Sequence, residues 1–376
     1  MLIALFSLTI FLTLGYVILI LLLYRGLFFL KPGKHNRLYQ VTVVVAARNE
    51  QENIGKCLNA LVNQSYTSEK YEIIIVDDRS TDKTVDIIKS YCKTYPQVKL
   101  IQVTELHDSI SPKKHALETG IEAAQGEIIL TTDADCIPAS GWIKGMVSYF
   151  ETDVGLVAGF SPLEKAGEKT IFSRLMTLDS LSLAAMAAGS FGLSKPLTCN
   201  GRNLAYRKET YQSVDGFKEI LHLISGDDDL LLHLVSQKTA WKVRYAIDPD
   251  TVVRSNVPVN YKHFANQRIR HASKGRYYSN WLKLLLVAVY VFNLCLIVLA
   301  PVSLFIFKAG MVWLACLFVK SLSEFVLIYR TAGLFRFKKS LSVFPLAIVL
   351  HPLYVVIFGF WGQIGKFQWK NETFCS

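Results

Sequence analysis

The stretch EIILTTDADC, residues 127–136, decides the fold of this chain. A short β-rich run, residues 127–130, leads into two aspartates two positions apart, Asp133 and Asp135. On extended backbone, side chains at that spacing project to the same side, so both carboxylates can face one ligand. Paired carboxylates suit Mg²⁺ or Mn²⁺, which bind hard oxygen atoms together with substrate phosphates. The stretch therefore predicts a strand that ends in a divalent metal site, with Asp133 and Asp135 as the metal ligands.

Three more β-rich runs precede this strand, at residues 41–46, 72–76 and 99–103. Apolar residues recur at helical spacing between these runs. Continuous apolar runs such as residues 73–76 are typical of strands that are covered on both faces. Strands that alternate with helices indicate a parallel sheet. We therefore predict an α/β, Rossmann-like, nucleotide-binding domain within residues 25–280.

Polar side chains follow three of these four strands at the point where each strand ends: Asn49 with Glu50, Asp77 with Asp78, and Asp133 with Asp135. Ligands of open α/β sheets bind outside the carboxyl ends of the strands, so these pairs predict one binding site. Each pair alone has a helix cap as its alternative, and residues 77–82 would start a helix in any case. Three pairs at three strand ends favour the ligand site.

Two groups of basic residues could meet a phosphate. Lys113 and Lys114 open the helix that precedes residue 127, and either could act as a point charge. Solvated surface lysines are the alternative. Gln267, Arg270 and His271 recur at i, i+3 and i+4 of a basic helical stretch and so share a face. Arginine is the natural bidentate partner of phosphate, but a basic amphipathic helix lying on anionic lipid is the alternative here.

Three adjacent aspartates, Asp227, Asp228 and Asp229, follow Gly226 and lead into another helical pattern. Adjacent carboxylates repel one another, so we expect raised pKa values among them. A carboxylate placed in this way can act as a general base toward an acceptor hydroxyl. The alternative is a helix N-terminus that is rich in aspartate because of the helix dipole.

Both ends of the chain are apolar enough to cross a bilayer. Residues 1–24 carry no charge, and three more apolar runs follow at residues 284–307, 311–329 and 342–361. Each run can span a hydrocarbon core of about 30 Å as a helix. A cleaved signal peptide is the rival for the first run, but its basic n-region and small-residue cleavage site are not evident. We predict four transmembrane helices: one at residues 1–24, and three within residues 281–376, followed by a short tail.

The formal net charge of +11 at pH 7 bears on both topology and partners. Basic residues gather beside the apolar runs, within residues 25–37 and 330–339, which favours the cytoplasmic face of a membrane over nucleic acid as their neighbour. We expect a multi-pass cell-membrane protein with membrane lipids and no nucleic acid among its partners. Residues 25–280 and 330–341 should be cytoplasmic, and Met1 external.

Lys320 and Glu324 lie one helical turn apart inside an apolar run, where charged side chains are costly. We expect the two side chains to pair with each other; a role in an acceptor or lipid path is the alternative.

The ordered motifs resemble those of the family 2 glycosyltransferases with a GT-A fold. The similar members are membrane enzymes such as cellulose, hyaluronan and chitin-oligosaccharide synthases and ceramide glucosyltransferase. The family order is matched by Asn49-Glu50, Asp77-Asp78, Asp133 with Asp135, Gly226-Asp227-Asp228, and Gln267 to His271. The resemblance covers about residues 41–280. It implies an enzyme that transfers a sugar, with inversion, from a nucleotide-sugar to a glycan or lipid-linked acceptor. UDP-sugars are the expected donors, and Mg²⁺ or Mn²⁺ is the expected cofactor.

The resemblance also implies a role for each matching residue. Donor-binding residues would be Glu50, Asp77, Asp78, Lys113, Asp133, Gln267 and Arg270. Asp228 would be the catalytic base, and Asp133 and Asp135 would hold the metal. The acceptor would meet Asn200, Gly201, Asp227 and His271.

His271 departs from the family pattern, which has tryptophan there as a stacking platform for the acceptor sugar. The difference favours the addition of one or a few sugars, and a processive polysaccharide synthase stays the alternative. A non-catalytic nucleotide-binding membrane scaffold is the alternative in another class. The intact carboxylates at every expected place argue against it. Nucleotidylyl transfer would need a glycine-rich turn after residue 46, and the sequence has none.

Overall fold

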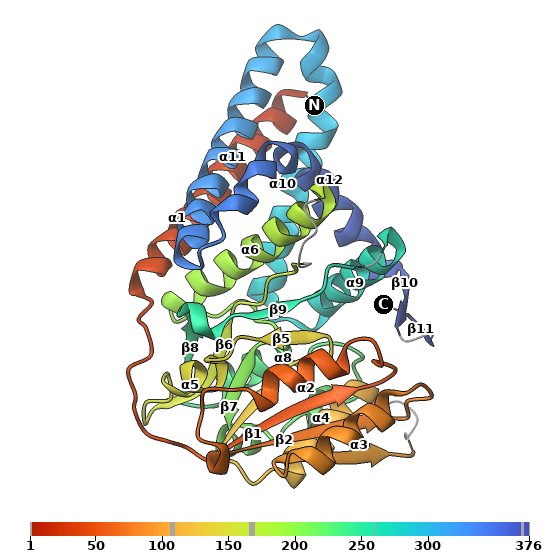
Figure 1. Cartoon of the computed structure of the whole chain (residues 1–376). Coiled ribbons are helices and arrows are strands. Elements are labelled where there is room, and N and C mark those ends of the chain that lie inside the picture. Colours follow the sequence, from red (N-terminus) through yellow and green to blue (C-terminus); the bar gives the residue numbers. More distant parts are fainter. Residues whose placement is uncertain (1, 106–109, 165–169, 259, 370–371, 376) are drawn as a thin grey trace. The chain divides into compact units, whose positions relative to one another are not determined.

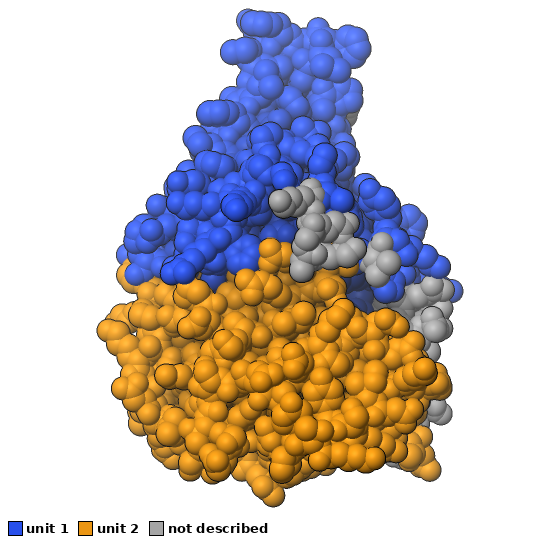
Figure 2. Space-filling view, viewed as in Figure 1, with its two compact units in different colours: residues 1–28, 169–185, 258–376 blue, residues 29–168, 186–257 orange. Residues whose placement is uncertain are grey.

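The computed structural model describes residues 2–105, 110–164, 170–258, 260–369 and 372–375. It forms two compact units, each built from separate stretches of the chain (Figure 2). The helical unit comprises Met1–Phe28, Lys169–Ala185 and Pro258–Ser376, and the α/β unit comprises Phe29–Glu168 and Met186–Val257. The domain boundaries expected from the sequence, at residues 24/25 and 280/281, stay a prediction. Met1, expected on the external face, lies outside the described residues.

The α/β unit contains a seven-stranded sheet with the strand order β3-β2-β1-β4-β7-β6-β8 (Figure 1). These strands are β1 (Val41–Ala47), β2 (Tyr71–Asp78), β3 (Val98–Val103), β4 (Ile128–Thr131), β6 (Val154–Gly159), β7 (Leu204–Arg207) and β8 (Lys242–Ala246). The four β-rich runs of the sequence are β1 to β4. They pair in parallel, with β2 and β4 on either side of β1 and with β3 beyond β2. The prediction of these four strands is confirmed.

The sheet as a whole is mixed, so the prediction of a parallel sheet is wrong beyond β4. β7 runs antiparallel to both β4 and β6, whereas β6 and β8 pair in parallel. Leu204, the first residue of β7, lies opposite Thr131, the last residue of β4. The segment before Leu204 therefore lies at the same edge of the sheet as the segment after Thr131. The apolar pattern of a single strand does not encode this reversal, because direction depends on the path of the intervening chain.

Helices cover both faces of the sheet. Those of the α/β unit are α2 (Ile54–Val62), α3 (Thr84–Thr94), α4 (Pro112–Ala123), α5 (Trp142–Val147), α7 (Lys208–Gln212) and α8 (Asp229–Lys238). Val43 of β1 packs in one buried cluster with Leu58 of α2. Val44, the next residue, faces α4, where a Cβ atom added to Gly120 would lie 2.5 Å from its Cγ1. Each such side chain contributes about 1.5–3 kcal/mol by burial. Burial on both faces explains the continuous apolar runs of the sequence.

Short elements complete the description. β5 (Cys136–Pro138) pairs antiparallel with β9 (Val253–Ser255), and β10 (Lys366–Trp369) with β11 (Glu372–Cys375). The 3₁₀ helices are η1 (Leu27–Phe29), η2 (Ser68–Lys70), η3 (Lys218–Ile220), η4 (Pro249–Thr251), η5 (Lys274–Tyr277) and η6 (Lys338–Val343). β5 directly follows the two aspartates of the predicted metal site, so the chain between β4 and β5 is short and held at both ends.

The long helices belong wholly or partly to the helical unit. They are α1 (Leu2–Gly26), α6 (Ile171–Gly192), α9 (Tyr261–Ser273), α10 (Asn280–Phe305), α11 (Phe307–Leu334) and α12 (Phe344–Ile364). Five segments of the described chain are helical, long and apolar enough to cross a membrane: Leu2–Phe29, Ile171–Gly192, Asn280–Phe305, Phe307–Leu334 and Lys338–Ile364.

Four of these five segments are the runs predicted from the sequence, and the fifth is α6. It is the least apolar of the five and the most buried. Arg174 and Asp179 interrupt its apolar pattern, which hid it from the sequence analysis. The predicted count of four transmembrane helices is therefore not confirmed.

A polar cluster lies inside the helical unit. The ammonium of Lys320 on α11 donates to both carboxylate oxygens of Glu324, at 2.8 and 2.9 Å. Tyr16 of α1 donates to Glu324 at 2.5 Å, and His351 of α12 lies 3.1 Å from the Lys320 Nζ atom. The predicted Lys320–Glu324 pair is confirmed, and it joins three helices through groups that are costly in an apolar bundle unless they are paired.

Candidate active site

The three strand-end pairs of the sequence lie at one edge of the sheet, because β1, β2 and β4 are parallel neighbours. The loops after β1 and β2 are joined to each other. The backbone N–H of Asn49 donates to Ser80 Oγ at 2.9 Å, and that of Glu50 donates to Thr84 Oγ1 at 2.8 Å. Asn49 has a φ of +52°, a left-handed conformation that asparagine tolerates better than most residues. These bonds fix the position of Glu50 at the edge.

Asp77 and Asp78 are both buried at the end of β2. Asp78 accepts a hydrogen bond from Arg79 Nε at 2.8 Å, and Asp77 accepts one from the Ser80 backbone N–H at 3.3 Å. Neither of them caps α3, whose N-cap is Lys83; Asp82, just before it, accepts the Thr84 backbone N–H through Oδ1 at the start of the helix. Asp77 and Asp78 thus stabilise the turn at the strand end, next to the site.

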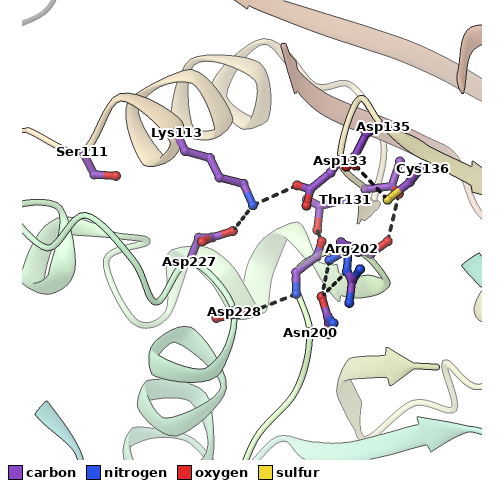
Figure 3. A network of polar contacts seen from close by, with 12 residues as sticks. Ser111, Lys113, Thr131, Asp133, Asp135, Cys136, Asn200, Arg202, Asp227 and Asp228 are labelled. Atoms are coloured by element: carbon purple, nitrogen blue, oxygen red, sulfur yellow. Dashed lines mark hydrogen bonds and ion pairs between the residues drawn. The ribbon is translucent and has the colours of Figure 1, made fainter. Parts of the chain in front are cut away.

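Asp133 and Asp135 form the acidic pair after β4, and Cys136 completes a group whose ligand atoms lie within 4.8 Å of one another (Figure 3). Burial raises the pKa of Asp135 to about 6, and the charges of Asp133 and Glu50 add to this effect, while Arg202 opposes it. Burial raises the pKa of the Cys136 thiol well above its usual value, so that this group stays neutral.

A hard divalent cation fits this group. The carboxylates repel one another, and a bound cation would relieve that repulsion. A neutral thiol is a poor ligand for Mg²⁺ or Mn²⁺, and Cys136 instead donates to Asp135 Oδ1 at 3.4 Å. The residues that would hold the ion are therefore Asp133 and Asp135.

The two lysines at the start of α4 have different surroundings. Lys113 lies between two carboxylates, with its Nζ 2.9 Å from Asp133 Oδ1 and 2.8 Å from Asp227 Oδ2 (Figure 3). Burial alone would lower the pKa of Lys113, but the charges of Asp133 and Asp227 outweigh it and raise the pKa. Lys114 is completely buried and donates to backbone carbonyls of the 221–225 segment. Neither is a solvated surface lysine, and the idea that either could meet phosphate is wrong for Lys114.

The helix-cap alternative is confirmed for Asp228, and its role as a base stays a prediction. Asp228 caps α8, where its Oδ1 accepts the Asp229 backbone N–H at 2.8 Å. Its Oδ2 accepts the backbone N–H of Gly201 at 3.1 Å (Figure 3). A Cβ atom on Gly201 would lie 2.9 Å from Asp227 Oδ2, so only glycine fits there without displacing the aspartate. Asp227, Asp228 and Gly201 thus lie together beside Lys113 and Asp133.

Arg202 and Asn203 directly follow Asn200 and Gly201 and had no predicted role of their own. Arg202 donates through Nε to Asn200 Oδ1 at 3.1 Å, and its charge acts on Asp135. Asn203 is completely buried and accepts the indole N–H of Trp142 at 2.9 Å. It also donates to two backbone carbonyls, those of Phe160 and Thr251. The signal in the sequence was their position next to Asn200 and Gly201, but their roles depend on contacts far along the chain.

Gln267, Arg270 and His271 lie on α9, in the helical unit. All three are partly exposed, whereas Arg268 between them is buried and forms an ion pair with Asp179 of α6 at 2.6 Å. The predicted helix and the shared face are confirmed. The roles of these three residues toward a donor or acceptor stay a prediction.

A mixed α/β sheet of this kind, with an acidic pair and a lysine at the carboxyl ends of its strands, is the nucleotide-sugar-binding fold of GT-A glycosyltransferases. The chain belongs to the family 2 glycosyltransferases. The sequence pattern of "Glycosyl transferase family group 2" matches residues 128–349, and that of "Glycosyl transferase family 2" matches residues 42–212.

Named relatives agree with this assignment. Glycosyltransferase AglE of Haloferax volcanii is 31% identical over 189 residues, which cover 50% of this chain and 58% of AglE. Beta-monoglucosyldiacylglycerol synthase of Nostoc sp. is 30% identical over 268 residues, 68% of this chain and 54% of the relative. The chain thus spans little more than half the length of these relatives.

A solved structure shares the fold over almost the whole chain. The mannosyltransferase PcManGT from Pyrobaculum calidifontis, in complex with GDP-Man and Mn²⁺, superposes with a TM-score of 0.59 at 22% identity. The match covers 95% of this chain and 99% of that one. At this identity the comparison shows the GT-A-like fold.

Proposed function

We propose that this enzyme transfers one or a few hexosyl units, with inversion, from a nucleotide-sugar to a glycan or lipid-linked acceptor at the cytoplasmic face of the cell membrane. One observation carries the proposal: contacts through Lys113 connect Asp133, a proposed metal ligand, to Asp227, which lies just before α8. Lys113 contacts both Asp133 and Asp227, and the neighbouring Asp228 contacts Gly201. Groups suited to a leaving diphosphate and a group suited to an attacking hydroxyl therefore lie in one place.

The donor half of the site uses the strand ends. We assign Glu50, Asp77 and Asp78 to the nucleoside, with UDP as the proposed nucleotide. In the α/β unit, Lys113 would bind the diphosphate, since a cation balances its charge. For Gln267 and Arg270 of α9, a role toward the diphosphate stays the prediction from the sequence. When bound to Asp133 and Asp135, Mg²⁺ or Mn²⁺ neutralises the charge that builds on the leaving diphosphate.

Asp228 is the proposed general base. Its carboxylate would accept the proton of the acceptor hydroxyl while that oxygen bonds to the anomeric carbon of the sugar. The bond from that carbon to the diphosphate breaks on the opposite side, which inverts the configuration. The bonds from Gly201 and Asp229 hold the carboxylate in one orientation, so it needs no rearrangement before the reaction.

In the α/β unit, Asn200, Gly201 and Asp227 would hold the acceptor. For His271 of α9, a role toward the acceptor stays the prediction from the sequence. A lipid acceptor is supported by the apolar helices and by the relative whose name is beta-monoglucosyldiacylglycerol synthase. Imidazole is a smaller and more polar platform than indole, which favours release after one or a few additions over processive synthesis. The basic residues after α1, between Arg25 and Arg37, support the cytoplasmic placement of the α/β unit.

Turnover by the wild-type enzyme and by Asp228→Asn tests this function. The purified protein in detergent, with Mn²⁺ and diacylglycerol, is offered UDP-glucose, UDP-GlcNAc and GDP-mannose, and release of the nucleoside diphosphate is measured. We expect one donor to be consumed, and Asp228→Asn to lower turnover about 10²–10⁴-fold with little change in UDP affinity. Binding of nucleotide without turnover of any sugar donor would favour the scaffold alternative. A joint loss of affinity and rate in the variant would make Asp228 a binding or folding residue.

A further inference from the structure

The loop of residues 221–225, between η3 and Gly226, is held by the N-cap and the first turn of α4. The backbone N–H of Ser111 donates to the Leu221 carbonyl at 2.8 Å, and its hydroxyl donates to that of Ile224 at 3.4 Å. Lys114 Nζ donates to the carbonyls of Leu223 and Ser225, the latter at 2.8 Å. Four of the five carbonyl groups of this irregular loop are therefore bound by two residues.

Lys114 is an unusual residue for this purpose, because its side chain is completely buried. A buried ammonium is costly unless its hydrogens are donated, and carbonyl oxygens here accept them. The same carbonyls would be costly without a donor, since a buried acceptor that loses its partner keeps its full desolvation penalty. The lysine and the loop therefore stabilise each other in one conformation.

This loop leads directly into the proposed catalytic residues. Gly226, which follows it, has a φ of +94°, and a Cβ atom there would lie 2.4 Å from the Leu230 side chain. Asp227 and Asp228 come next. The same turn of α4 carries Lys113, which contacts Asp133 and Asp227. Adjacent lysines thus hold the acidic segment twice, one through its carboxylate and one through the backbone before it.

We propose that Lys114 is a positioning residue of the transfer reaction, which sets Asp227 and Asp228 relative to Asp133 by fixing the 221–225 loop. The proposal rests on the proposed function, in which Asp228 is the base. Lys114 itself touches neither donor nor acceptor. Its loss should therefore lower kcat and leave nucleotide binding at the strand ends nearly unchanged.

The test compares Lys114→Met with Lys208→Met. Lys208 is a matched control because its Nζ also donates to backbone carbonyls, those of Glu122 and Ala124, at the opposite end of α4. We expect Lys114→Met to lower kcat about 10–100-fold, the size of effect that a displacement near 1 Å produces. The affinity of Lys114→Met for UDP in the presence of Mn²⁺ should differ less than about threefold from that of the wild type. In Lys208→Met, kcat should also differ less than about threefold from the wild-type value. Equal kcat in the two variants would overturn the proposal.

Hydrogen exchange tests the same point without a substrate. In Lys114→Met, amides of residues 221–228 should exchange faster, while those of β3 should not, and Lys208→Met should leave both unchanged. Unchanged exchange in the 221–228 segment would refute the proposal. Should Lys114→Met fail to fold, Ser111→Ala removes one bond to the same loop and should show the same pattern more weakly.

A double variant separates this proposal from the proposed function. Gly226→Ala also disturbs this loop, but without touching Lys114. Because both changes act on one loop, the fold-loss of kcat in the double variant should be smaller than the product of the two single fold-losses. A full product would mean that Lys114 acts elsewhere. If Asp228→Asn keeps full turnover, the proposed function fails. If Asp228→Asn is inactive while Lys114→Met is normal, only the positioning role fails.

Discussion

Replacing Lys113 by methionine should weaken the binding of UDP and strengthen the binding of Mn²⁺. Methionine keeps the length and apolar stem of the side chain but removes the charge between Asp133 and Asp227. That charge competes with a cation for Asp133, since the Lys113 Nζ lies 2.9 Å from Asp133 Oδ1. The same charge would attract a diphosphate, so its removal acts on the two ligands with opposite sign.

The size of the effect follows from the burial of these groups. The side chains of Lys113, Asp133 and Asp227 are 19%, 32% and 10% exposed. A charge-assisted contact to diphosphate in such a place contributes about 1.5–3 kcal/mol. At about 1.4 kcal/mol per factor of ten, UDP should bind about 10–150-fold more weakly. The free energy of unfolding should also fall in the variant. The loss should be smaller than the cost of about 3–5 kcal/mol for breaking a fully buried pair, because Asp133 is partly solvated.

Calorimetry decides between these expectations. Mn²⁺ alone is titrated into the wild type and the variant, and UDP is then titrated at saturating Mn²⁺. Lys99→Met is the control, because Lys99 forms one lysine–carboxylate contact, to Glu72 at 2.7 Å, away from the site. If UDP and Mn²⁺ affinities in Lys113→Met match those in Lys99→Met, the assignment of Lys113 to the diphosphate is wrong.

Three further predictions concern other parts of the chain. Asp133→Asn should weaken Mn²⁺-dependent UDP binding at least about tenfold, because one of two hard ligands becomes neutral; calorimetry with and without Mn²⁺ that shows wild-type metal dependence would count against the site. His271→Trp should preserve transfer and lengthen the products, as mass spectrometry would show, and long polymer from the wild type would contradict the release of short products. For the topology, Cys57 is too buried to report on sidedness. Cysteine placed at exposed Ser68 should resist an impermeant reagent in sealed cells, whereas cysteine at Lys308 should react; the reverse pattern would invert the orientation.

β1, β2 and β4 could be predicted because burial on both faces leaves a continuous apolar run, as in Ile73–Val76. β7 could not, since Leu204–Arg207 is not a run of β-branched residues and its direction is set by pairing with β4 and β6. Adjacent lysines pose a similar problem. Lys113 and Lys114 point about 100° apart on α4, and only the packed structure shows which of them faces the carboxylates.

The aspartates before α8 show a different limit. The sequence offered a helix cap or a general base, and Asp228 has the geometry of a cap while its second oxygen lies against Gly201. The cap is therefore confirmed, while the role of general base, which would use the second oxygen, stays a prediction. The fifth apolar helix, α6, was missed because Arg174 and Asp179 break its pattern, although Asp179 is paired with Arg268.

The reversed strand β7 has a consequence for how such an enzyme diversifies. The proposed donor residues of the α/β unit all precede residue 136, and the proposed acceptor residues of that unit all follow residue 198. The two sets meet because Leu204 lies opposite Thr131. In the proposed function, two consecutive segments of the α/β unit would therefore bind the donor and the acceptor, and they share one short strand pair. Substitutions in the later segment of this unit would then change the acceptor preference while the earlier segment keeps its donor contacts, so that the two preferences could evolve at separate rates.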